Sequence, residues 1–295
     1  MKVRALAYIG LEATDVAAWQ SYATDVLGLM KVHSEDTGTV KFRMDTRSWR
    51  IAVEQGRRND IAYVGFEVAN PDDLDVVRRR VEEYGIAVTR GDADLLTKRG
   101  VVDLFHFQDL IGLRVEVFYG ATEVFEQPFC SPTGISGFVT GEQGIGHVVL
   151  LVPDVQLARR FYEKTLGLQL TDIIDMPTPA GTVELLFMNC NARHHTLALA
   201  RMASEQKLDH FLIEVASIDD MGLAYDRALK SGVPIRATIG RHTNDHMVSF
   251  YAYTPSGVAV EYGWGARTLN RDWNVVRYDS ASVWGHHRPP RGERA

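Results

Sequence analysis

The fold is decided by the stretch Gly144-Ile145-Gly146-His147-Val148-Val149-Leu150-Leu151-Val152-Pro153-Asp154. Residues 146–152 predict a β-strand that ends at the proline, and the aspartate after it is a good N-cap for a helix. Apolar side chains then follow at three- and four-residue spacing up to Leu166, and Gly167 is suited to end that helix. One imidazole, His147, interrupts the apolar strand. A single buried histidine is more often a hydrogen-bonded structural residue than a ligand, so its role depends on its partners.

The same unit recurs along the chain. Three pairs of segments align, 7–16 with 146–155, 62–68 with 209–215, and 112–116 with 257–261. Each pair repeats the pattern of the strand, and the first two pairs also repeat the helix that follows. The sequence therefore predicts two halves of two modules each, in which a module consists of a strand, a helix and three further strands.

The predicted fold class is α+β, with four βαβββ modules that form two curved-sheet barrels. The helices are expected at about 15–28, 72–84, 154–166 and 219–231, where they cover one face of each sheet.

The expected domains are an N-terminal domain at 1–125, a linker at 126–142 and a C-terminal domain at 143–265. Residues 266–295 are expected to be a tail, with disorder from Pro289. Within this tail, residues 284–287 (Trp-Gly-His-His) are expected to dock on the protein rather than to bind a metal.

Composition excludes several classes of function. The 295 residues include 32 basic and 38 acidic side chains, and a net charge of -6 argues against nucleic-acid binding. Two cysteines, Cys130 and Cys190, are too few for a disulfide framework and lack metal-ligand spacing. No stretch approaches the roughly 20 apolar residues that a membrane-spanning helix needs. We expect a cytoplasmic globular protein without nucleic-acid or membrane partners.

A comparison of the halves isolates the residues that carry chemistry. Three pairs of positions align, Tyr8 with His147, Tyr63 with His210, and Glu116 with Glu261. With 10 histidines in 295 residues, two chosen positions are both histidine by chance only about once in nine hundred. Two histidines and one carboxylate on one face form the facial ligand set of non-haem Fe(II) sites. Because the first half retains its glutamate, this residue also has a possible structural use.

The motifs around these positions resemble those of the type I extradiol (catechol meta-cleavage) dioxygenases of the vicinal oxygen chelate superfamily, in particular the 2,3-dihydroxybiphenyl 1,2-dioxygenases. The resemblance extends to about residue 288 and is carried by Gly146-His147, Asn191-Ala192-Arg193-His194-His195, Asp209-His210, Gly240-Arg241-His242-Thr243-Asn244-Asp245, Ser249-Phe250-Tyr251 and Val260-Glu261-Tyr262-Gly263. It implies that His147, His210 and Glu261 bind Fe(II) and that the N-terminal half binds no metal. Mn(II) is an alternative, because the ligand set suits both ions.

The resemblance also implies catalytic roles. His195, which aligns with Trp49 of the first half, would accept a proton from the catechol and later return it. His242 and Tyr251 would hydrogen-bond the substrate oxygens. His194 should point to the other face of its strand, where we expect a packed or exposed neighbour without a catalytic role.

Four further residues are expected to contact or surround the substrate. Asn244 and Asp245 would lie in the loop that orients the histidine of the same motif, as substrate-binding residues. Val149 shares a strand face with the first metal ligand and should line an apolar pocket. Phe187 is a second candidate for that wall, although a position in the core explains it equally well.

The implied reaction inserts both atoms of O₂ into a bicyclic or polycyclic-derived catechol such as 2,3-dihydroxybiphenyl, as in aromatic degradation. The expected partners are the catechol and O₂, and the expected assembly is a homo-oligomer. Two alternatives stay open: a glyoxalase-like metal-dependent isomerase or transferase, and a non-catalytic ligand-binding member of the same superfamily. The sequence does not choose among biphenyl-, dibenzofuran-, naphthalene- and steroid-derived diols.

Overall fold

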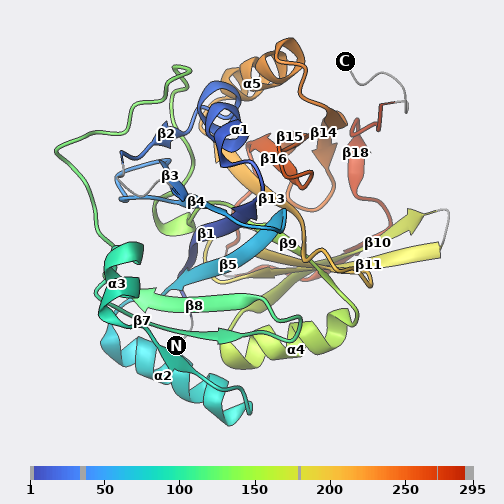
Figure 1. Ribbon diagram of the computed structural model, residues 1–295. Helices are drawn as coiled ribbons and strands as arrows, with labels where there is room; N and C mark the ends of the chain where they lie inside the picture. The colour runs from blue at the N-terminus through green and yellow to red at the C-terminus, as the bar shows by residue number, and fades with distance from the viewer. Residues whose placement is uncertain (1–2, 34–37, 179–180, 271, 290–295) are drawn as a thin grey trace.

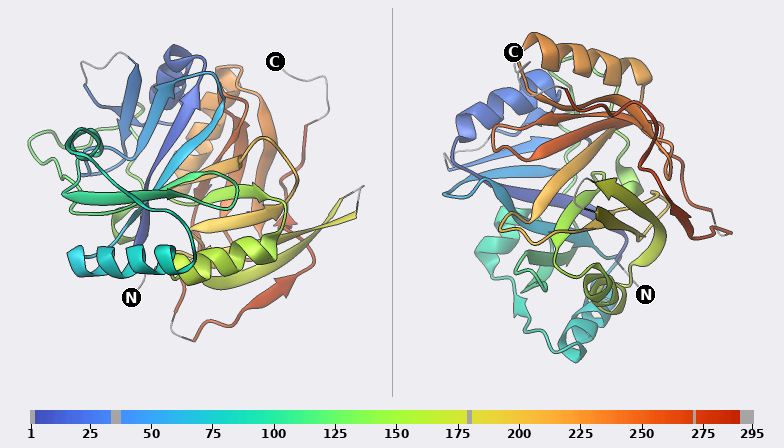
Figure 2. Two further views of the ribbon diagram at one scale, coloured as in Figure 1. Left: turned by 60° about the horizontal axis from the view of Figure 1, so that its bottom comes forward. Right: turned by 90° about the vertical axis from the view of Figure 1, so that its right-hand side faces the viewer.

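The structure is a computed structural model that describes residues 3–33, 38–178, 181–270 and 272–289. Two strongly curved sheets lie next to each other, and helices pack on their outer surfaces (Figures 1 and 2). Each sheet contains two successive βαβββ modules, so the predicted α+β fold of four modules is confirmed. The sheets curl without closing, since each has two edge strands.

The first sheet is built from the N-terminal half. Its strands are β1 (Ala5–Ala13), β2 (Met30–Lys31), β3 (Thr39–Arg43), β4 (Ile51–Gln55), β5 (Asp60–Glu67), β6 (Thr89–Arg90), β7 (Asp103–Gln108) and β8 (Arg114–Tyr119). They are arranged in the order β2-β3-β4-β1-β5-β8-β7-β6. The first strands of the two modules, β1 and β5, pair antiparallel at the centre, and each pairs parallel with the last strand of its own module.

The second sheet repeats this arrangement with two added strands. It consists of β9 (Val148–Val152), β10 (Gln169–Thr178), β11 (Gly181–Asn189), β12 (Leu197–Arg201), β13 (Leu208–Val215), β14 (Ile235–His242), β15 (Val248–Tyr253), β16 (Ala259–Trp264), β17 (Val276–Tyr278) and β18 (Ser282–Trp284). The strands are arranged in the order β17-β10-β11-β12-β9-β13-β16-β15-β14-β18, and β9 and β13 pair antiparallel at the centre.

Strand β9 begins at Val148, two residues later than predicted. At Gly146, with φ of +140°, a Cβ would lie 2.0 Å from the Leu212 carbonyl oxygen, so this close approach requires glycine.

The helices follow the predicted positions, with one addition. They are α1 (Val16–Ser21), which continues into a π-helical turn η1 (Tyr22–Val26), α2 (Pro71–Glu83), α3 (Ala93–Arg99), α4 (Val155–Thr165) and α5 (Ile218–Lys230), with a short 3₁₀ turn η2 (Gly141–Gln143). The sequence did not predict α3. Asp154 caps α4 as expected, since its side chain accepts from the backbone N–H groups of Gln156 and Leu157. None of the described helices is long and apolar enough to cross a membrane.

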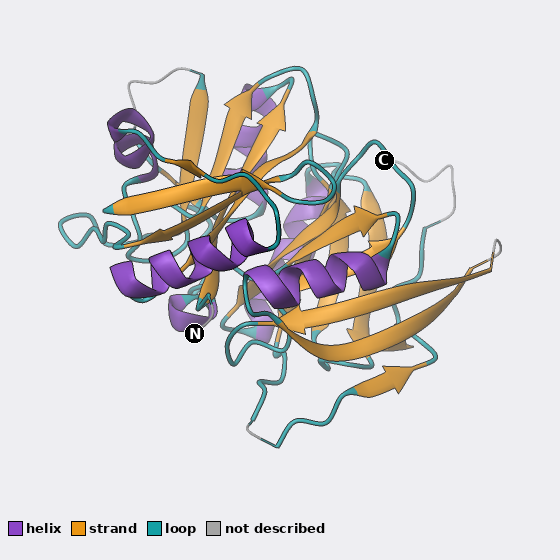
Figure 3. Cartoon of the chain, turned by 90° about the horizontal axis from the view of Figure 1, so that it is seen from below, coloured by secondary structure: helices purple, strands orange, loops and turns teal. Residues whose placement is uncertain are grey.

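The two halves share one hydrophobic core. Helices α2 and α4, from different halves, lie next to each other beneath the two sheets (Figure 3), and the ring centroids of Tyr84 and Phe161 are 5.2 Å apart between them. At the opposite end of the sheets, the Trp19 indole N–H donates to Ser256 Oγ at 2.7 Å. A single cluster of buried apolar side chains runs through both halves.

The expectation of a C-terminal tail needs correction. Strand β17 pairs with β10, and β18 pairs with β14, so the segment extends both edges of the second sheet. Such three-residue edge strands carry too little periodicity to be recognised in the sequence. The segment 284–287 docks as predicted: the His286 ring lies 4.3 Å from the His242 ring, and its Nδ1 contacts Ser282 Oγ at 2.7 Å. The disorder predicted from Pro289 falls on residues 290–295, which lie outside the described residues.

Candidate active site

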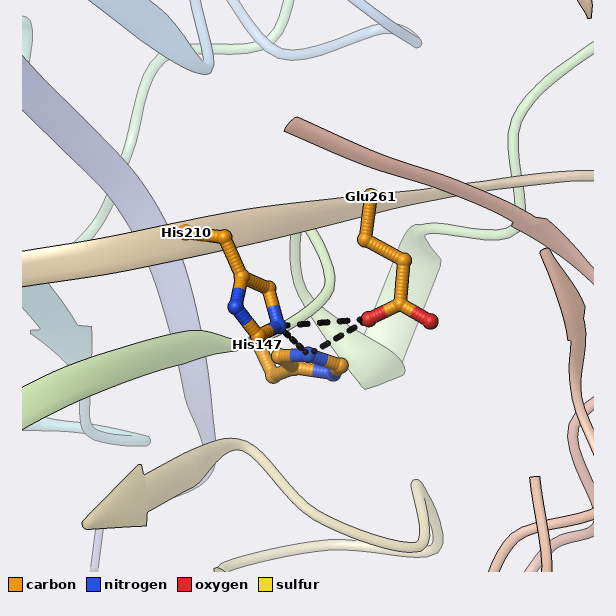
Figure 4. A group of neighbouring side chains, drawn as sticks. All are labelled: His147, His210 and Glu261. Atoms are coloured by element: carbon orange, nitrogen blue, oxygen red, sulfur yellow. Dashed lines mark hydrogen bonds and ion pairs between the residues drawn. The ribbon is translucent and has the colours of Figure 1, made fainter. Parts of the chain in front are cut away.

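Three side chains that the comparison of the halves singled out meet at the centre of the second sheet (Figure 4). The Nε2 atoms of His147 and His210 are 3.4 Å apart, and Glu261 Oε2 lies 3.2 Å from the first and 3.3 Å from the second. Neighbouring ligands of an octahedral ion are about 3 Å apart when each bond is about 2.1 Å long. The three atoms therefore form a triangle of the size of one octahedral face, and the donor set fits a divalent metal ion.

The central strand β13 sets this geometry. His210 lies on β13, opposite Val149 of β9, and His147 immediately precedes β9. In the parallel pair of β13 and β16, Glu261 is in register with Leu212, which is two residues beyond His210 and therefore on the same face. His147, His210 and Glu261, the triad of candidate metal ligands, are all buried.

The hydrogen bond that His210 makes through Nδ1 leaves its Nε2 available to bind a metal ion. Asp209 Oδ2 lies 2.7 Å from His210 Nδ1, so Nδ1–H donates to the carboxylate and Nε2 keeps its lone pair. Arg236 donates to the same carboxylate at 2.8 Å. Although burial opposes ionisation, His210 and Arg236 hold the pKa of the Asp209 carboxyl below its usual range. Neither Asp209 nor Arg236 was predicted as an orienting residue.

The two oxygens of Glu261 have different partners. Oε2 faces the two histidines of the triad, whereas Oε1 accepts from Ser249 Oγ at 2.7 Å and from His242 Nε2 at 3.1 Å. Burial would raise the pKa of Glu261, but the hydrogen bonds from the surrounding imidazoles and their charge lower it far more. The side chain is therefore a carboxylate, as a metal ligand must be. Ser249 was not predicted as its partner.

His242 and Tyr251 lie together at the edge of the triad. His242 Nε2 is 2.8 Å from the Tyr251 hydroxyl, and its Nδ1–H donates to the Ala281 carbonyl oxygen at 2.9 Å. Burial lowers the pKa of His242, but the Glu261 carboxylate outweighs it and raises the pKa to about 9. A protonated His242 can donate from both nitrogens.

The loop after His242 does not orient that ring as expected, because the Ala281 carbonyl group occupies its Nδ1. Asp245 instead accepts from the Met247 backbone N–H at 3.0 Å, and its other oxygen lies 3.9 Å from His195 Nδ1. Asn244 is buried, and its amide nitrogen has no hydrogen-bond partner within the described residues. It is a donor that remains available to another group.

His195 stacks against the triad. The centroid of its ring lies 4.0 Å from that of the His147 ring and 4.9 Å from that of the Phe187 ring, with Phe187 and His195 packed edge to face. Burial, together with the neighbouring imidazoles of His147 and His194, holds the pKa of His195 well below its ordinary value, so the ring is neutral near pH 7.

His194 is not exposed. Its Nδ1 lies 3.1 Å from His195 Nδ1 and its Nε2 lies 2.8 Å from Asp172 Oδ2.

An apolar cluster adjoins His195 on its sheet face. It contains both predicted wall residues and is separate from the main core; its buried members are Val149, Leu151, Ile174, Phe187, Ala198 and Ala200. Cross-strand pairing explains the cluster, since Phe187 is opposite Ala198, and Ala198 is opposite Val149. The structure thus brings together the predicted site residues His147, His210, Glu261, His195, His242, Tyr251, Asp245, Val149 and Phe187, whereas no hydrogen bond or ion pair among the described residues links Asn244 to them.

Comparisons with known proteins match nearly the whole chain. The model of the Glyoxalase/Bleomycin resistance protein/Dioxygenase superfamily matches residues 144–262, and that of Dihydroxybiphenyl dioxygenase BphC D1 matches residues 6–56. Biphenyl-2,3-diol 1,2-dioxygenase of Metapseudomonas furukawaii is 53% identical over 97% of this chain and 94% of its own length. An iron-dependent extradiol dioxygenase of Rhodococcus jostii is 38% identical over 97% of both chains.

A solved structure agrees with these relatives. The crystal structure of BphC, a halotolerant catechol dioxygenase, matches with a TM-score of 0.93 and 35% identity, and covers 97% of this chain and 95% of that one. The family models, the relatives and the solved structure all include dioxygenases, which agrees with the candidate metal triad. The chain belongs to the extradiol dioxygenases of the Glyoxalase/Bleomycin resistance protein/Dioxygenase superfamily.

Proposed function

We propose that this protein is an Fe(II)-dependent extradiol dioxygenase that cleaves a bicyclic catechol of the biphenyl-2,3-diol type. The observation that carries the proposal is the triangle of donor atoms from His147, His210 and Glu261, with His195 stacked on it and Tyr251 at its edge. The 53% identity to a biphenyl-2,3-diol 1,2-dioxygenase supports the substrate class. Bound iron would supply the electron transfer between the catechol and O₂.

The polar residues around the triad would handle protons. His195 is neutral and buried, so its imidazole can take a proton from a catechol hydroxyl and return it later. His242 lies 2.8 Å from Tyr251, and this pair would donate hydrogen bonds to substrate oxygens. Asn244 adds an amide donor that has no partner of its own among the described residues. Asp245 would act on the substrate only through His195, from which it is 3.9 Å away.

The apolar cluster would receive the second ring of the substrate. Val149 and Phe187 belong to it, and Phe187 also contacts His195. A bicyclic diol would therefore bury its unreactive ring on apolar side chains while its hydroxyl groups face the polar residues. The same wall keeps water away from the site of proton transfer.

The test is ring cleavage in ¹⁸O₂. Protein loaded anaerobically with Fe(II) should consume one O₂ per 2,3-dihydroxybiphenyl, and the product should contain both ¹⁸O atoms with the ring opened beside the hydroxyl pair. Protein loaded with Mn(II) is assayed in parallel, and activity with Mn(II) alone would replace iron in the proposal. If iron-loaded protein consumed no O₂ with mono- or bicyclic catechols, the proposal would be wrong, and a glyoxalase-like or ligand-binding role would take its place.

A further inference from the structure

A row of polar side chains leads away from the triad behind His195. His195 Nδ1 is 3.1 Å from His194 Nδ1, and His194 Nε2 is 2.8 Å from Asp172 Oδ2. Asp172 lies on β10, and all three side chains are at least 95% buried. Buried polar groups in such a row must satisfy one another, so their hydrogen bonds have a defined direction.

The direction is fixed from the carboxylate end. Both Asp172 oxygens accept, since the Val276 backbone N–H donates to Oδ1 at 2.8 Å and the His194 Nε2–H donates to Oδ2. A neutral imidazole carries one hydrogen, so His194 Nδ1 must accept from His195 Nδ1–H. His195 is then left with its lone pair on Nε2. Asp245 Oδ2, at 3.9 Å from His195 Nδ1, favours a hydrogen on that same nitrogen.

We propose that Asp172 and His194 are positioning residues that fix the tautomer of His195, so that its Nε2 is the proton acceptor of the reaction. This inference rests on the proposed function for the role of His195. In serine proteases a carboxylate selects the tautomer of the catalytic histidine directly. Here Asp172 would do so through His194, whose imidazole lies between the carboxylate and His195.

The C-terminal segment holds the row in place. Strand β17 aligns the Val276 N–H with Asp172, and the Trp273 ring packs edge-on against the His194 ring at 5.1 Å. The Trp273 indole N–H donates to the Thr171 carbonyl oxygen at 3.1 Å, next to Asp172. Arg267 covers the Trp273 ring at 4.5 Å. The segment expected to be a tail therefore closes the site from behind.

A second metal ion is the competing explanation for this cluster. One ligand atom each from His194, His195 and Asp245 lies within 4.8 Å of the others. The hydrogen-bond distance between the two Nδ1 atoms favours a shared hydrogen instead, because two metal-bound nitrogens carry none. The two explanations predict one and two metal ions per chain, respectively.

The decisive variant is Asp172→Asn. Its carboxamide oxygen can keep the bond from the Val276 N–H, which turns the amide NH₂ toward His194 and reverses both following hydrogen bonds. His195 Nε2 would then carry the hydrogen. We expect kcat to fall by about 10²-fold or more, with KM and iron content within a factor of about two of the parent. The control is Asp175→Asn, three residues along β10, whose half-buried side chain pairs with Arg277 of β17; it should leave kcat unchanged.

A conservative rescue separates positioning from packing. In His194→Asn, the side-chain oxygen lies near the place of the ring Nδ1 and can still accept from His195, so it should retain more turnover than His194→Phe, which keeps the volume and loses the acceptor. Equal loss in both variants, or loss of iron along with turnover in Asp172→Asn, would overturn the proposal.

The tautomer is also measured without the reaction. ¹⁵N NMR of histidine-labelled, metal-free protein should show the hydrogen of His195 on Nδ1 in the parent and on Nε2 in Asp172→Asn. The opposite assignment in the parent, or two bound irons per chain, would refute the proposal. If the parent failed to cleave any catechol, the proposed function would be wrong, while these spectra would still decide the tautomer.

Discussion

The two halves of the molecule keep a buried carboxylate at the same strand position and surround it with different partners. In the first half, Glu116 accepts from the Tyr8 hydroxyl at 2.6 Å, from Arg99 Nε at 2.7 Å and from Arg114 Nε at 2.8 Å. In the second half, the aligned Glu261 faces imidazoles and has one oxygen directed at a metal-sized triangle. The same strand position thus belongs to an ion pair in one half and to the candidate metal site in the other.

Arg99 occupies the place in the first half that corresponds to the candidate metal site of the second. It arrives at the end of α3, a helix between β6 and β7 that has no counterpart between β14 and β15. Its guanidinium lies 3.8 Å from the centroid of the Tyr63 ring, and the remaining cavity beside it is only about 10 Å³. The guanidinium of Arg99 therefore supplies the positive charge that the buried Glu116 requires, in a half that has tyrosines at the positions of the two histidines.

The largest effect is expected in the second half, at the candidate metal site. His210→Ala should lose iron retention and ring cleavage entirely, because a facial set of three ligands cannot spare one. The protein should stay folded by circular dichroism, and the parent should hold one iron per chain by metal analysis. Stoichiometric iron with turnover in the variant would remove His210 from the ligand set, and two irons in the parent would contradict the inert first half.

The next effect is on stability, in the other half. Arg99→Met should lower the free energy of unfolding by about 3 to 5 kcal/mol, because it leaves Glu116 fully buried without its main cation. The matched control is Arg58→Met, which breaks an exposed pair with Glu12 and should cost less than about 1 kcal/mol. Urea denaturation measures both. Equal losses would mean that Arg99 does not replace a metal ion.

A third effect depends on pH. Burial opposes ionisation of Glu116, but the Arg99 guanidinium holds its pKa below the ordinary value. A carboxyl with a lowered folded-state pKa adds stability above its unfolded pKa of about 4.3, and this stability is lost as the pH falls through the folded value. Glu116→Gln should therefore be less stable at pH 7 and show a shallower loss between about pH 5 and 3. Parallel pH curves for parent and variant, measured by urea denaturation, would contradict this sign.

The smallest effect is expected at the position aligned with His210. Tyr63→Phe keeps the ring under Arg99 and removes only the hydroxyl that donates to Glu54 at 2.9 Å. The loss should be about 1 kcal/mol, with iron content and kcat unchanged. A loss of iron in this variant would show that the two halves are coupled in metal binding.

The repeated pattern was enough to predict the modules and to place the triad. Aligned strands must present equivalent residues on the same face, so His147, His210 and Glu261 could be paired with Tyr8, Tyr63 and Glu116 before any geometry was known. The same face rule placed Val149 beside the first histidine of the triad, whereas the other members of the apolar cluster did not follow from it.

Residues that act across the repeat were not predictable. Helix α3 has only seven residues, so its periodicity is weak, and nothing in the sequence brings Arg99 to Glu116. Asp172 and Ser249 reach the site through tertiary pairing of β10 and β15 with other strands. The Ala281 carbonyl, which holds His242, belongs to backbone and leaves no mark in the sequence.

The core that runs through both halves makes their stabilities inseparable. The Val3 N–H donates to the Leu166 carbonyl oxygen, and the Tyr262 hydroxyl donates to the Leu27 carbonyl oxygen, so each half completes hydrogen bonds of the other. Unfolding should then be cooperative for the whole chain. An ion present at 100 times its dissociation constant adds about 2.7 kcal/mol to the folded state, and this linkage would slow hydrogen exchange in the first sheet as well. An ion held by the triad of the second half would thus protect the first half as well.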